Sequence, residues 1–190
     1  KPYFDIDIEN PDFDSEDFIR KLIESISKNI PVENTILVYE SHWMRKKSFH
    51  IVVDKVFLKN EMECESFYFR CIENIPEKYQ KYVDNGVYKK VQQFRLLGCH
   101  KYNKENTKKL NTDLSVNYNI PKNYKNSEKA ISNYNFFISL IGNIVGCVYL
   151  EGFSVVEKKR FLLLVLLLLV IWKKFWTFSI RNFRMKIMDS

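Results

Sequence analysis

The sequence has few of the features that mark an exported, zinc-binding or disulfide-bonded chain. It has four cysteines but no CxxC spacing, and no leader-like apolar segment opens it. We therefore expect reduced thiols in an intracellular compartment, with the nucleus and the cytoplasm both left open. The same spacing disfavours a structural zinc site, although the neighbours Cys99 and His100 leave one pair of zinc ligands open.

Long hydrophobic runs are also absent. The longest, FLLLVLLLLVIW at residues 161–172, has twelve apolar residues, whereas a membrane-spanning helix needs about 20. We therefore expect no stable membrane insertion. A buried segment, an interfacial segment and a tail foreign to the domain are the alternatives that the run leaves open.

Positive charge is present in excess but unevenly placed. The net charge is +7 over 190 residues, and residues 152–190 hold eight Lys or Arg against two acids, so the tail supplies most of it. A second stripe runs from Lys89 to Lys109, where seven basic residues face only Glu105. This stripe is the better indication of a polyanionic partner.

Periodicity predicts a mixture of strands and helices. Alternating and β-branched runs favour strands at residues 3–8, 35–40, 48–57 and 91–98, and helical spacing favours helices at 15–29, at 61–73 and from Ser127 onward. The polar, Asn-rich run 102–126 is expected to be a loop or linker. We divide the chain into a core at 1–105 with residues missing upstream, a linker at 106–126, a helix packing on the core at 127–150 and an atypical tail at 151–190.

The opening strand carries two acids on one face. In YFDIDI, side chains two apart point the same way, so Asp5 and Asp7 oppose the apolar Phe4, Ile6 and Ile8. An ordinary solvated strand face would explain this pattern. Aspartate is depleted in strands, however, so a cation or a site facing the two carboxylates is the competing interpretation.

Two further motifs supply groups suited to phosphates. In KKSFHIVV, Lys46, Ser48 and His50 alternate on one strand face and offer an ammonium, a hydroxyl and an imidazole, although a histidine at the core edge is an equally simple interpretation. In VDNGVYKKVQQFRLLGCHK, Asp84 precedes a turn dipeptide, and Arg95 lies in an apolar run six residues before Lys101. A salt bridge from Arg95 to Asp84 is the structural alternative.

The ordered set YFDIDI, KKSFHIVV, VDNGVYKK and FRLLGCHK resembles the archaeo-eukaryotic primase superfamily over about residues 1–105. The similarity is greatest to eukaryotic primase-polymerases and to the N-terminal primase domain of poxvirus-type and giant-virus primase-helicases. The resemblance implies an α/β (α+β) fold with a largely antiparallel sheet, like that of an RNA-recognition motif, packed with helices. Cys99-His100 before the final lysine, the tail, and the lack of a visible zinc module or Walker A motif depart from the family.

The resemblance also implies roles for these residues. It implies template-dependent nucleotidyl transfer in DNA replication, with two Mg²⁺ or Mn²⁺ ions held by Asp5, Asp7 and Asp84. Ser48 and His50 would donate to the phosphates of a nucleoside triphosphate, with Lys46, Arg95 and Lys101 adding charge around it. The DNA template would meet Lys89, Lys90 and Lys104, and a helicase domain or partner is expected.

Two other functions compete with this one. A catalytically inactive nucleic-acid-binding remnant would keep the sheet without the reaction, but it would be expected to lose one of the three acids, and all three are present. A metal-dependent nuclease would also gather acids around a divalent cation beside a lysine.

Overall fold

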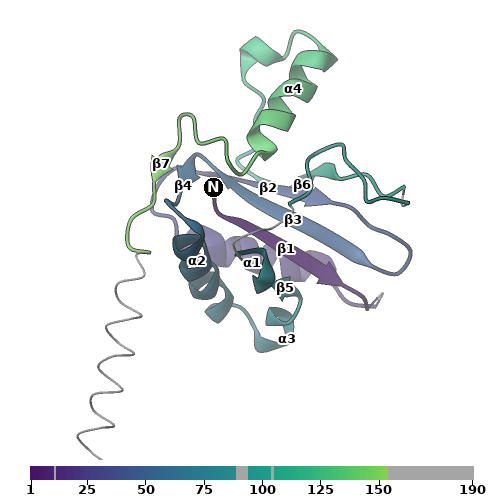
Figure 1. Ribbon diagram of the computed structural model, residues 1–190, viewed down its shortest axis with the longest axis vertical. Helices are drawn as coiled ribbons and strands as arrows, with labels where there is room; N and C mark the ends of the chain where they lie inside the picture. The colour runs from purple at the N-terminus through teal and green to yellow at the C-terminus, as the bar shows by residue number, and fades with distance from the viewer. Residues whose placement is uncertain (11, 89–93, 104, 154–190) are drawn as a thin grey trace, which may run out of the picture. The chain divides into compact units, whose positions relative to one another are not determined.

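The computed structural model describes residues 1–153 except 11, 89–93 and 104, and the tail at 154–190 lies outside the described residues. Figure 1 shows a sheet with helices on both sides of it. The helices are α1 (Ser15–Lys28), α2 (Glu61–Glu73), α3 (Glu77–Gln80) and α4 (Glu128–Ser139), with 3₁₀ turns η1 (Asn85–Tyr88) and η2 (Lys122–Tyr124). The strands are β1 (Tyr3–Ile8), β2 (Thr35–Glu40), β3 (Lys47–Asp54), β4 (Val56–Phe57), β5 (Val83–Asp84), β6 (Lys109–Val116) and β7 (Val148–Tyr149).

The main sheet has five strands in the order β5-β1-β3-β2-β6, and every neighbouring pair is antiparallel. Central strands β1 and β3 are therefore next to each other although about 40 residues separate them in the chain. The predicted α/β class with a largely antiparallel sheet is confirmed.

One face of the sheet carries the main core. Phe4, Ile6 and Ile8 of β1 are completely buried there with α1 and α2, as the alternation in YFDIDI predicted. The α1 helix contributes Phe18 and Leu22 to the same cluster, which is the amphipathic pattern expected of a helix packed on a sheet. Because this face takes every second residue of β1, the aspartates are directed to the other face.

The opposite face is only partly covered. Leu37, Tyr39 and Val52 form a smaller buried cluster with Ile138 of α4. Figure 1 shows α4 on the side of the sheet away from α1 and α2. The rest of this face, over β1 and the first half of β3, carries polar side chains.

Helix starts follow their capping residues closely. The side chains of Asp14, Asn60 and Ser127 accept hydrogen bonds from backbone N–H groups in the first turns of α1, α2 and α4. Helices occur at all three predicted places, but the helix expected over 127–150 ends at Ser139, and Val148–Tyr149 within that range forms β7. Among the described residues, no helix is long and apolar enough to cross a membrane; the run 161–172 lies outside them.

The strand predicted at 48–57 is two strands. Lys55 adopts a φ of 68°, a left-handed conformation that interrupts the pleat between β3 and β4. Beyond this break, β4 leaves the main sheet and pairs with β7 in parallel. The prediction failed because the lysine at the break looks like an ordinary solvent-facing strand residue.

The strand predicted at 91–98 is absent at residues 94–98, and the loop predicted at 102–126 is wrong at residues 109–116. Residues 94–98 form no strand, whereas Lys109–Val116 inside the expected loop forms β6 beside β2. Only Leu114 of β6 is buried. The ladder with β2 is irregular: the Ser115 hydroxyl accepts from the Val38 N–H of β2, and the Asn111 side chain accepts from the Leu114 N–H within β6. An edge strand with so little apolar surface gives no alternation to detect.

Candidate active site

The register of β1 against its two neighbours sets the geometry of the site. Asp5 lies opposite His50 and Asp7 opposite Ser48 across β3, while on the other side Asp5 lies opposite Asp84 of β5. Directly opposed residues of an antiparallel pair point to the same face. Three adjacent strands thus bring the predicted acids, hydroxyl and imidazole to one face of the sheet.

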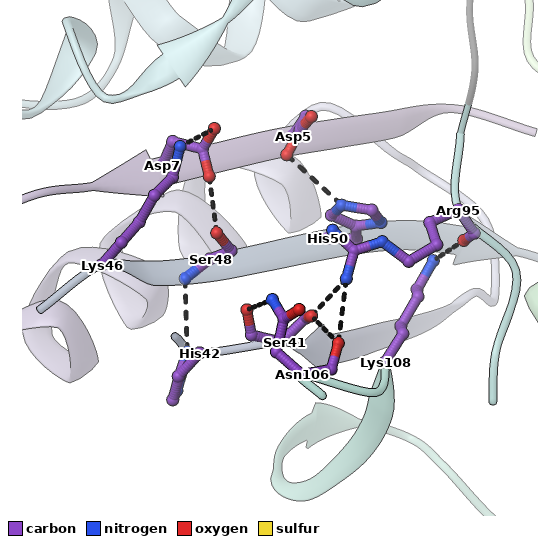
Figure 2. Close-up of polar contacts among 10 residues, drawn as sticks. All are labelled: Asp5, Asp7, Ser41, His42, Lys46, Ser48, His50, Arg95, Asn106 and Lys108. Carbon is purple, nitrogen blue, oxygen red and sulfur yellow. Dashed lines mark hydrogen bonds and ion pairs between the residues drawn. The ribbon is translucent and has the colours of Figure 1, made fainter. Parts of the chain in front are cut away.

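A pocket of about 680 Å³ opens over this face. It is lined by Asp5, Asp7, Ser48, His50, Phe94, Arg95, Leu96, His100, Lys101 and Tyr102. Six of the residues selected from the sequence therefore share one cavity. Lys46 does not line the pocket, but its ammonium pairs with Asp7, which does, as Figure 2 shows.

Asp7 is held by two donors. The Lys46 ammonium lies 2.8 Å from its Oδ2, and the Ser48 hydroxyl donates to its Oδ1 at 2.6 Å (Figure 2). Burial alone would raise the pKa of Asp7, but the hydrogen bonds from Lys46 and Ser48 outweigh it and lower the pKa. Asp7 is therefore a firmly ionised carboxylate.

Asp5 has the opposite electrostatic environment. Burial, followed by the nearby charges of Asp7 and Asp84, raises its pKa from 3.8 to about 6. Its closest polar neighbour is the His50 ring, with Nε2 3.4 Å from Oδ1. Asp5 thus carries negative charge that the surrounding side chains do not fully compensate.

Asp84 lies beside Asp5 but turns toward its own loop. It is exposed, and its Oδ1 accepts a 2.7 Å hydrogen bond from the backbone N–H of Gly86. A Cβ at Gly86 would stand 2.9 Å from that oxygen, so glycine leaves the space that the carboxylate occupies. In this arrangement, no three His, Cys, Asp or Glu side chains among the described residues are grouped closely enough to hold a metal ion.

His50 faces the pocket yet is almost completely buried. Its ring lies 4.5 Å from the Phe94 ring, and burial lowers its pKa to about 2, assisted by the charges of Lys108, Arg95 and Lys101. Its Nδ1 has no hydrogen-bond partner in the described structure. His50 is therefore a neutral imidazole with one N–H to donate, rather than a cation.

The two predicted cations further along the chain differ in their surroundings. Arg95 donates through one terminal nitrogen to the Asn106 carbonyl at 3.2 Å and to the Ser41 hydroxyl, so these contacts replace the salt bridge to Asp84 considered from the sequence. Lys101 is exposed on the pocket wall. Lys89, Lys90 and Lys104 lie outside the described residues.

The sequence analysis did not identify the residues that hold Arg95 in place beside the pocket. Ser41 and Asn106 bind each other and Arg95, and Lys108 donates to the Arg95 carbonyl, as Figure 2 shows. Lys108 had been counted in the basic stripe, and nothing in its local sequence distinguishes a buried lysine from a solvated one. The cysteines are all free, so the zinc pair suggested by Cys99 and His100 gains no further ligand within the described part.

Comparison with known proteins gives one consistent match. No protein-family model matches the chain. Over 102 residues it is 31% identical to a protein of African swine fever virus isolate Tick/Malawi/Lil 20-1/1983 and 30% identical to that of strain Badajoz 1971 Vero-adapted. Both are provisionally named helicase/primase complex proteins; the match covers 51% of this chain but only 9% and 10% of theirs. Over about half of its length, the chain is thus similar to much longer viral proteins whose name joins a primase to a helicase.

Proposed function

We propose that this chain carries the catalytic core of a viral-type DNA primase or primase-polymerase, which performs template-dependent nucleotidyl transfer. The observation that supports this most strongly is the register of β1: Asp5 and Asp7 share a face with Asp84 on one side and with Ser48 and His50 on the other. The similarity to the viral relatives points to the same process.

The donor set suits Mg²⁺ or Mn²⁺. Three carboxylates supply the hard oxygen ligands that these ions prefer, and the raised pKa of Asp5 reflects its burial first and then the charges of Asp7 and Asp84, which a divalent cation would offset. Asp5, Asp7 and Asp84 would hold the ions once the Asp84 carboxylate turned from the Gly86 N–H toward Asp5. When bound, two such ions activate the attacking hydroxyl and offset charge on the leaving pyrophosphate.

The remaining side chains divide the other tasks. Ser48 fixes the orientation of Asp7 through its 2.6 Å hydrogen bond, and the neutral His50 offers one N–H to a phosphate oxygen. Arg95 and Lys101 stand on the pocket wall as cations for the triphosphate. Lys46 is paired with Asp7. If another cation bound Asp7, the Lys46 ammonium would be free to bind a phosphate.

The partners follow from the same proposal. The substrates are nucleoside triphosphates and a DNA template, and Lys89, Lys90 and Lys104 in the basic stripe are the proposed template contacts. The name shared by the relatives joins a primase to a helicase, so a helicase domain or subunit is the proposed protein partner.

The test is extension of a primed and of a bare DNA template by the full chain with nucleotides and Mn²⁺. Asp84→Asn should reduce product formation about 10³-fold, whereas Asp113→Asn, an exposed acid on β6 outside the pocket, should leave it unchanged. Degradation of DNA without nucleotides would instead identify a nuclease. Binding of DNA without any reaction would identify an inactive remnant.

A further inference from the structure

Lys108 is a buried lysine directly beneath the candidate active site. It precedes β6, exposes 1% of its surface and is among the largest fully buried side chains of the described chain. It does not line the pocket above it. A role as a solvent-facing contact for a polyanion is therefore excluded by its position.

The ammonium of Lys108 is surrounded by a carbonyl and two rings instead of a carboxylate. Its Nζ donates to the Arg95 carbonyl at 2.6 Å and lies 4.4 Å from the Phe94 ring centroid and 4.7 Å from that of Tyr39. Burial, followed by the charge of Arg95, lowers the pKa of Lys108 to about 7. A buried ammonium without an ionic partner lowers the stability of the fold through its desolvation cost. An apolar side chain of equal length would pack there without that cost.

The segment that Lys108 binds has no regular structure of its own. Residues 94–98 belong to neither a strand nor a helix, yet they carry Arg95 on the pocket wall and Phe94 against His50. Backbone bonds tie the end of this segment to Lys108 through Gly98 and Cys99. The Lys108 side chain adds the only side-chain hydrogen bond recorded to the Arg95 backbone in the described structure.

We propose that Lys108 is a positioning residue that fixes Arg95 and Phe94 for binding of the nucleotide's phosphates. This inference rests on the proposed function, because it assigns Lys108 to the same nucleotide site. Phe94 is held between the Lys108 ammonium and the His50 ring, and the Arg95 carbonyl is held directly, so one buried side chain sets the place of two pocket residues. Lys108 itself touches no substrate.

The experiment measures affinity of the full chain for a fluorescent ATP analogue in Mn²⁺ together with the midpoint of thermal unfolding. The variants are Lys108→Met, Arg95→Met, the double variant, and Lys122→Met as an exposed control with the same substitution. Lys108→Met should weaken binding about tenfold, as expected for loss of a charge-assisted hydrogen bond, while the unfolding midpoint stays or rises. Added to Arg95→Met, it should cause a smaller loss than in wild type, because the part of its effect that passes through the Arg95 guanidinium is already gone.

The results distinguish a failure of this inference from a failure of the proposed function. Failure of the wild-type chain to bind the nucleotide would overturn both. Binding by wild type that Lys108→Met leaves intact, or a loss of equal size in the Arg95→Met background, would overturn only the role of Lys108. Should Lys108→Met not fold, Lys108→Gln, whose shorter and uncharged side chain cannot make the same charge-assisted bond, is measured in its place and must weaken binding in the same way.

Discussion

The electrostatic conflict at Asp5 predicts that its neutral isostere stabilises the metal-free protein. A pKa of about 6 in place of 3.8 corresponds to about 3 kcal/mol of unfavourable free energy for the ionised form at neutral pH. The side chain is 26% exposed, so water moderates this value only in part. Asp5→Asn should therefore raise the free energy of unfolding by about 2–3 kcal/mol at pH 8, or the unfolding midpoint by about 5–10 °C.

The pH dependence has a definite sign. The pKa of Asp5 is higher in the folded protein than in the unfolded chain, so the folded state binds this proton more tightly. The stability that this group contributes is fully present below pH 3.8 and is lost as the pH rises through about 6. The advantage of Asp5→Asn over wild type should accordingly grow from pH 4 to pH 7. Titration of Asp7 and His50 is common to both proteins.

The assay is urea unfolding of the full chain in a chelator at several pH values. Asp113→Asn serves as the matched control, because this exposed acid should give no comparable pH-dependent gain. Mn²⁺ should then stabilise wild type and not Asp5→Asn, since a ligand that binds only the folded state raises its stability. An Asp5→Asn variant no more stable than wild type at pH 8, or a difference that does not change with pH, would refute the reasoning.

Further predictions follow from other elements. Asp84→Asn should reduce nucleotide transfer about 10³-fold, since metal ligation supplies several kcal/mol, while the unfolding midpoint hardly changes because the residue is exposed. NMR of the His50 ring should show a neutral imidazole from pH 8 down to pH 4, because burial lowers its pKa to about 2; protonation within that range would contradict the burial. Leu22→Ala on α1 should cost about 2–5 kcal/mol in urea unfolding, and Asn60→Ala about 1 kcal/mol through loss of the α2 cap.

Local patterns predicted the elements whose burial is strongly one-sided. The alternation in YFDIDI placed Asp5 and Asp7 correctly on the face away from the core, and helical spacing placed α1 and α2. The same alternation put Ser48 and His50 on one face. These features can be predicted because apolar and polar residues within one segment alternate with its buried and exposed faces.

The parts that failed depend on contacts between distant segments. β6 forms because β2 offers an unpaired edge, not because its own residues favour a strand. Lys108 is buried because Phe94, Tyr39 and the Arg95 carbonyl surround it, and no pattern within its own segment reports them. The orientation of Asp84 toward Gly86 is likewise a tertiary detail.

The position of the acids on paired strands makes the site sensitive to changes in chain length. Asp5 meets His50 and Asp84 through ladder register alone, so a single inserted or deleted residue in β1 would turn at least one of Asp5 and Asp7 toward α1 and α2, and a one-residue slip of the whole strand would turn both. Insertions in the connections beyond β2 or α2 leave that register untouched. Relatives that keep this chemistry should therefore vary freely in loop length while showing no gaps across β1 and the first half of β3.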